Sequence, residues 1–119
     1  MTVLCVAIGG AAGVLARYGL GTLVSGDHLP TLTVAINVAG SFLLGFLLPF
    51  GHDLPAAVRT GLAVGVLGGF TTFSTFSVDV FLDLETGRAG EAALYLMASV
   101  VLGVAAAAGG YYAARGLAT

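Results

Sequence analysis

The architecture of this chain is decided by one polar stretch near its middle, Gly68-Gly69-Phe70-Thr71-Thr72-Phe73-Ser74-Thr75-Phe76. Two adjacent glycines precede a run of hydroxyl groups and aromatic rings, and no charged residue occurs between Arg59 and Asp79. Lipid offers these hydroxyl groups no hydrogen-bond partner, and irregular backbone at membrane depth is tolerated only inside protein or beside a watery cavity. The stretch is therefore the leading candidate for the functional site.

The composition of the 119-residue chain is that of a membrane protein, with 58% hydrophobic residues, 8% charged residues and a mean hydropathy of +1.05. Soluble domains carry about 25% charged residues. Because a helical span takes roughly 20 apolar residues, the chain has room for about four spans and for no separate enzymatic domain. We predict one all-α integral membrane domain over residues 1–119.

The predicted spans are 2–24, 31–50, 56–84 and 92–114. The third is longer than a hydrocarbon core of about 30 Å requires at about 1.5 Å per residue. We therefore predict two half-helices that meet at a break within residues 68–72, with a simple glycine kink as the alternative. The N-terminus lacks the basic start of a cleaved signal peptide, so we expect the first span to be retained.

The basic residues are four arginines, Arg17, Arg59, Arg88 and Arg115. With four spans, two of them lie toward each face of the membrane. An excess of Lys and Arg in short loops sets the orientation of a membrane protein, and here the count is balanced. The sequence therefore predicts insertion in both orientations.

Titratable and nucleophilic residues are sparse in the apolar segments. A single cysteine, Cys5, cannot form an intrachain disulfide, and the sequence holds no nucleophile–base pair and no set of metal-ligating side chains, which argues against an enzyme. A small four-span multidrug antiporter is the main alternative, but it would carry an acidic residue at depth in its first span. The first acidic residue here is Asp27, in a turn.

The polar side chains of the apolar segments are suited to an anion. Phe73 and Phe76 are three residues apart on one helix face, and an aromatic ring is electropositive at its edge. Asn37 adds an amide donor, and hydroxyl donors come from Ser74, Thr75, Tyr95 and Ser99. Neutral donors can replace the hydration of an ion without trapping it. The alternative is ordinary packing, with the hydroxyl groups bonded to their own helices.

The predicted break allows a second kind of site. The first half-helix ends in carbonyl groups without helical partners, and carbonyl oxygens are hard ligands suited to an alkali cation. Two chains related by a two-fold axis could supply an oxygen cage at the centre of the bilayer.

The chain resembles the CrcB/Fluc fluoride channels over essentially its whole length. The matching motifs are Gly9-Gly10-Ala11-Ala12-Gly13 with Arg17-Tyr18, Asn37-Val38-Ala39-Gly40-Ser41-Phe42-Leu43-Leu44-Gly45, and the central stretch from Gly68 to Phe76. The resemblance implies four-helix subunits that pair as antiparallel, dual-topology homodimers with two fluoride pores. It also implies passive fluoride export across the cell membrane and hence resistance to fluoride.

The resemblance further implies roles for individual residues. The pore residues would be Phe73, Phe76 and Asn37, with a polar track of Ser74, Thr75, Thr33, Tyr95 and Ser99. A structural Na⁺ would be held by the backbone carbonyls of Gly68 and Thr71 from both subunits, and Arg17 would be a vestibule or structural arginine. Some relatives pair as products of two genes, but the intact motifs and balanced arginines favour a homodimer. A packing subunit of a larger complex would leave the central hydroxyl groups unexplained.

Overall fold

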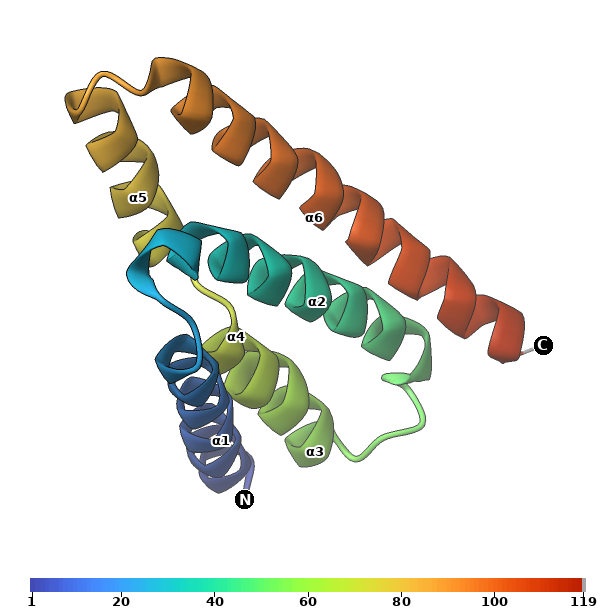
Figure 1. Ribbon diagram of the computed structural model, residues 1–119. Helices are drawn as coiled ribbons and strands as arrows, with labels where there is room; N and C mark the ends of the chain where they lie inside the picture. Colours follow the sequence, from blue (N-terminus) through green and yellow to red (C-terminus); the bar gives the residue numbers. More distant parts are fainter. Residues whose placement is uncertain (119) are drawn as a thin grey trace.

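The computed structural model describes residues 1–118, and helices account for nearly all of that range. The elements in chain order are α1 (Thr2–Thr22), the 3₁₀ turn η1 (Gly26–His28), α2 (Leu29–Phe50), α3 (Ala56–Thr60), the π-helical η2 (Gly61–Leu67), α4 (Gly68–Phe70), α5 (Ser74–Glu85) and α6 (Ala89–Leu117). Figure 1 shows their arrangement as long rods joined by short turns.

Four helical segments are long and apolar enough to cross a membrane, namely Thr2–Thr22, Gly26–Phe50, Ala56–Glu85 and Ala89–Leu117. They confirm the prediction of an all-α chain with four membrane-spanning segments. The last helix extends three residues beyond each end of the expected apolar span 92–114. Its extra turns carry Glu91 at the N-terminus and Arg115 at the C-terminus. These charges interact favourably with the helix dipole. The sequence prediction missed the extra turns because it followed apolar residues only.

The third segment is not one uniform helix. Backbone from Ala56 to Phe70 is helical, and Gly61–Leu67 within it is wound as a π-helix. Helix then stops, because Thr71 takes an extended conformation with ψ of 160°, and α5 begins at Ser74. Gly68 and Gly69, which the sequence placed inside a break, are therefore helical, and the non-helical residues are 71–73.

The helices pack as two pairs. The first helix, α1, runs along η2 and α4, whereas α2 runs along α6. Glycines make both approaches close: a Cβ added to Gly13 would collide with the Val66 carbonyl oxygen, one on Gly45 with that of Ala107, and one on Gly110 with that of Phe42. Small residues at membrane helix interfaces allow such backbone contact. Gly13 in the first span therefore serves close helix packing.

Few side chains are buried in the interior of the molecule. Within residues 1–118, the buried apolar side chains are those of Ile36, Phe76, Ala92, Tyr95 and Ala114. Most other large apolar side chains are exposed on a molecule of 49 × 30 × 21 Å, which suits a protein whose exterior meets lipid tails rather than water. Phe76 and Tyr95 are thus two of the few large rings that the fold encloses.

Candidate functional site

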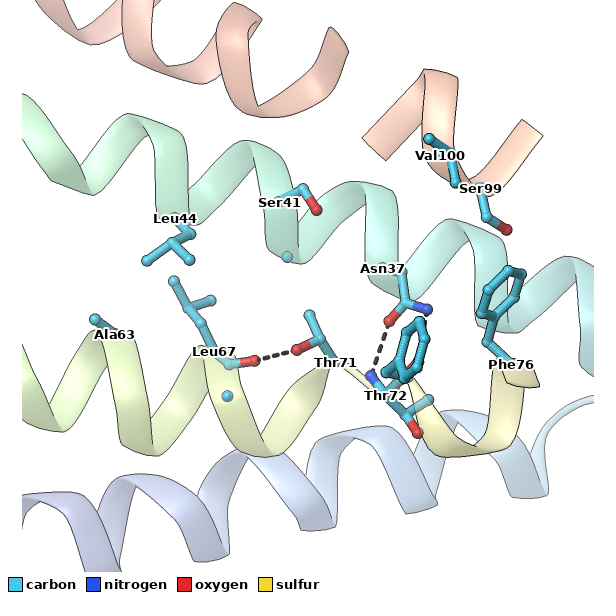
Figure 2. A pocket seen from close by; sticks show the side chains of 13 residues that line it. Asn37, Ser41, Leu44, Ala63, Leu67, Thr71, Thr72, Phe76, Ser99 and Val100 are labelled. Atoms are coloured by element: carbon cyan, nitrogen blue, oxygen red, sulfur yellow. Dashed lines mark hydrogen bonds between the residues drawn. The ribbon is translucent and has the colours of Figure 1, made fainter. Parts of the chain in front are cut away.

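A cavity of about 330 Å³ lies between the two helix pairs. Figure 2 shows it bounded by α2, by η2 and α4, by the start of α5 and by α6. Its polar and aromatic lining residues are Asn37, Ser41, Thr71, Thr72, Phe73, Phe76 and Ser99, and the remainder are glycine, alanine and aliphatic residues. Within residues 1–118, no charged side chain lines this cavity.

One wall of the cavity is held by a double hydrogen bond between α2 and the non-helical residues. The Asn37 Nδ2 donates to the Thr72 carbonyl oxygen at 2.9 Å, and the Thr72 N–H donates to Asn37 Oδ1 at 2.8 Å. A backbone that leaves the helix inside a membrane protein must find such partners, because lipid supplies none. Figure 2 shows this pairing at the centre of the cavity wall.

Two further side chains hold the backbone around residues 71–73. Arg17 on α1 donates from Nε to the Gly69 carbonyl oxygen at 3.3 Å. The Thr71 hydroxyl donates to the Leu67 carbonyl oxygen at 2.9 Å, one turn back. The segment is therefore tied to α1 and α2 and to its own preceding helix.

The aromatic rings form a short chain of contacts. The centroids of Phe73 and Phe76 are 5.9 Å apart, those of Phe76 and Tyr95 are 5.1 Å apart, and both ring pairs are tilted. Phe76 is 7% exposed, whereas Phe73 is 78% exposed. Phe76 is thus fixed in the wall against Tyr95, while Phe73 stands at the rim. The Tyr95 hydroxyl donates to Asp79 Oδ2 at 3.3 Å.

Ser99 on α6 provides an unusual polar atom. Its Oγ is buried and makes no hydrogen bond in the part of the chain that the structure describes, and the residue lines the cavity. Leaving a buried hydroxyl unpaired costs about 1–3 kcal/mol. Figure 2 shows the hydroxyl on the side that faces Phe76. A bound polar species in the cavity would give Ser99 the partner that the protein does not.

The other predicted residues do not line the first cavity, apart from Gly68 and Thr71. Thr33, Thr75 and Arg17 line a second cavity of about 320 Å³, which Thr72 also lines. The Thr33 hydroxyl donates to the Leu29 carbonyl oxygen of its own helix at 3.0 Å. Tyr95 supports Phe76 from behind, and Ser74 is exposed and lines none of the described cavities.

Gly68 and Thr71, predicted to hold Na⁺, both line the first cavity. The Thr72 N–H is the ordinary helical partner of the Gly68 carbonyl, but it donates to Asn37 instead. Neither the Gly68 nor the Thr71 carbonyl accepts a hydrogen bond from another residue between positions 1 and 118. These oxygens are thus chemically suited to a hard cation.

Two polar lining residues of the first cavity, Ser41 and Thr72, were not predicted as site residues. Ser41 lies four residues after Asn37 and so on the same face of α2, a spacing from which it could have been found. Thr72 contributes through backbone atoms that pair with a side chain 35 residues away. No local pattern indicates such a pairing, because any residue carries the same backbone groups.

Comparison with known proteins agrees with the motifs. The family model described as "CrcB-like protein, Camphor Resistance (CrcB)" matches residues 4–111. The chain is 47% identical over 113 residues to a fluoride-specific ion channel FluC of Thermus thermophilus, covering 91% of this chain and 90% of that protein. It is 45% identical over 120 residues to the fluoride-specific ion channel FluC 1 of Nitrobacter hamburgensis, covering 95% and 94%.

A third relative, the fluoride-specific ion channel FluC of Rhodospirillum centenum, is 47% identical over 122 aligned positions, which cover 97% of this chain and 93% of that protein. The matches span all four apolar segments and the whole of the cavity wall. The chain therefore belongs to the CrcB-like family, as its three motifs predicted.

Proposed function

We propose that this multi-pass membrane protein is a fluoride-specific channel that exports F⁻ passively across the cell membrane and thereby gives resistance to fluoride. The family and its relatives named as fluoride-specific channels support this function. The structural observation that carries it is the cavity walled by neutral donors and aromatic rings, without a charged side chain among its described lining residues.

The chemistry of the cavity suits a small, strongly hydrated anion. Hydroxyl and amide donors can replace water around the ion, and ring edges add a weak positive potential. A fixed positive charge would bind the anion too tightly for it to leave. We assign the pore to Asn37, Phe73, Phe76 and Ser99, with Thr33 and Thr75 along its approach. Ser74 and Tyr95 line neither cavity, and we assign them to the approach on the family motif alone.

Passive export has a simple physical logic. Neutral HF crosses membranes, ionises inside the cell, and leaves an anion that the bilayer retains. A channel lets this anion leave down its electrochemical gradient, so the protein needs neither an enzymatic step nor a coupled proton. The multidrug antiporter is not supported, since no carboxylate from residues 1–118 lines the first cavity and the predicted first span 2–24 holds no acidic residue.

The finer architecture is also a proposal. Two copies would pair in antiparallel orientation to form two pores, with the third segment of each acting as two half-helices. The balanced arginines support dual insertion. A reporter at the C-terminus is then expected on both faces of the membrane, and a strict preference for one face would refute the antiparallel pair.

A structural Na⁺ fits the same arrangement. The Gly68 carbonyl has lost its helical partner to Asn37, and the Thr71 carbonyl follows the last helical residue of α4. Both residues line the first cavity, and a second copy related by a two-fold axis would supply the same oxygens. The ion would hold the two subunits together and fix the interrupted segment.

The function is tested by ion release from liposomes. Purified protein should release trapped fluoride, but not chloride, when a potassium ionophore clamps the membrane voltage. Protein-free liposomes prepared in parallel give the background leak. Equal release of both halides would refute a fluoride-specific channel, and release of neither would refute channel activity.

A further inference from the structure

We propose that Asn37 is a positioning residue, which holds the backbone of Thr72 and through it the first turn of α5 with Phe73 and Phe76. The sequence suggested a direct donor to the ion. The structure instead commits both ends of the Asn37 amide to one backbone residue. The consequence for ion flux rests on the proposed function, whereas the pairing itself does not.

The pairing meets a need that the backbone creates. Thr71 is extended with ψ of 160°, which turns the Thr72 N–H away from the Gly68 carbonyl, its ordinary helical partner. A buried backbone donor or acceptor without a partner is costly. The N–H and C=O of Thr72 both face the Asn37 side chain, so this single amide satisfies both groups.

Thr72 in turn holds the first turn of α5 through a hydrogen bond. Its Oγ1 accepts a hydrogen bond from the Thr75 N–H at 3.4 Å, one of the N–H groups at the start of α5 that lack helical partners. Phe73 precedes this turn and Phe76 belongs to it, with its ring packed on Tyr95 at 5.1 Å. A displaced Thr72 would therefore displace both phenylalanine rings.

The number of hydrogen atoms limits what else Asn37 can do. An asparagine amide has two N–H donors and one acceptor oxygen. One donor and the oxygen are used by Thr72, which leaves one N–H for the cavity. Of the two N–H donors of the side chain, only one is thus left for an anion.

The first experiment measures the exchange of the Thr72 amide hydrogen by NMR on the full chain in nanodiscs. Asn37→Ala should speed the exchange about five- to tenfold, as expected for loss of one hydrogen bond. The matched control is Ser41→Ala, which removes a polar group one turn along the same face of α2 and should leave Thr72 exchange unchanged. Unchanged exchange in Asn37→Ala would overturn the proposal.

A second variant distinguishes the two hydrogen bonds between Asn37 and Thr72. It also tests the proposal if Asn37→Ala does not fold. At a pH at which the new carboxyl group is ionised, Asn37→Asp retains an acceptor for the Thr72 N–H but has no donor for the Thr72 carbonyl. Amide exchange should stay close to that of the wild type, while the infrared band of a ¹³C-labelled Thr72 carbonyl should move to higher frequency. A carbonyl band at the wild-type position would contradict the pairing.

Fluoride flux then links the pairing to function. Asn37→Gln retains both hydrogen-bonding groups, so it should recover Thr72 protection and flux together relative to Asn37→Ala. Loss of flux in Asn37→Ala with Thr72 protection intact would show a direct ligand and overturn the positioning role. If wild-type protein conducts no fluoride, the proposed function fails, but the exchange result still decides whether Asn37 holds Thr72.

Discussion

Phe76 contributes both to the packing of the fold and to the lining of the proposed pore. It is enclosed by the fold, it contacts both Phe73 and Tyr95, and it lines the cavity beside the unpaired hydroxyl of Ser99. Phe73, in contrast, is largely exposed in one chain. The two phenylalanines therefore share a motif but not an environment, since Phe76 is buried within the chain and Phe73 is exposed.

Replacement of Phe76 by Ile is expected to reduce fluoride flux about tenfold or more. Isoleucine retains bulk but has no ring edge, and loss of an interaction of about 1.4 kcal/mol corresponds to a tenfold change. Loss of the aromatic contacts should also lower stability by about 0.5–1.5 kcal/mol. Flux from liposomes and thermal unfolding measure the two effects separately.

Phe81→Ile is the matched control for this prediction. Phe81 lies on the same helix, is 57% exposed and lines neither of the two cavities described above. Its replacement should leave fluoride flux unchanged. Wild-type flux in the Phe76 variant would exclude a role for its ring in the pore.

At the scale of elements, glycine spacing determines which helices touch. Gly61, Gly65 and Gly69 follow one another at intervals of four, and a Cβ on each would meet α1 at Cys5, Val6 or Gly10. These three glycines therefore form the surface of the third segment on which α1 packs. The hydroxyl groups begin where this contact ends, so α1 supports the third segment up to the non-helical residues.

Gly13→Ala tests the importance of this contact. The added methyl group would collide with the Val66 carbonyl oxygen and approach the Phe70 nitrogen at 2.9 Å. Overpacking of this kind costs typically about 1–3 kcal/mol, so the midpoint of thermal unfolding in detergent should fall by several degrees.

Gly10→Ala is the matched control on the same helix. A Cβ at Gly10 meets nothing within 4 Å, and alanine favours helix over glycine by about 1 kcal/mol. This variant should unfold at the wild-type temperature or above it. Equal midpoints for Gly13→Ala and the wild type would show that α1 and η2 can separate at little cost.

At the scale of the whole molecule, the chain forms two helix pairs (Figure 1). The first cavity lies between these pairs. Gly68, Thr71 and Phe73 all line this cavity. Such a surface suits the proposed second copy and the proposed Na⁺, because each would cover groups that one chain leaves uncovered.

Removal of Na⁺ is expected to weaken the proposed dimer. An ion that binds only the folded pair at about 100 times its dissociation constant contributes about 2.7 kcal/mol. Exchange of Na⁺ for N-methyl-D-glucamine at equal ionic strength should therefore shift the protein mass in light scattering from dimer toward monomer. The same mass in both solutions would argue against a structural cation between the subunits.

The sequence by itself determined the number of membrane-spanning segments, the family and the position of the polar centre. These depend on apolar length, on local motifs and on residue types that lipid cannot satisfy, all of which can be read along the chain. The residues that line the cavity were found in part for the same reason: Asn37, Phe73, Phe76 and Ser99 carry distinctive side chains at membrane depth.

Only the tertiary structure decided how these groups are used. The pairing of Asn37 with Thr72 joins residues 35 positions apart, and the bond from Arg17 to Gly69 joins residues 52 apart. Their partners are backbone atoms, which are identical at every residue and so leave no mark in the sequence. Such bonds exist because helix packing brings α1 and α2 against a backbone that has lost its helical partners. For that reason the central stretch was recognisable from its residue types, but the groups that hold it were not.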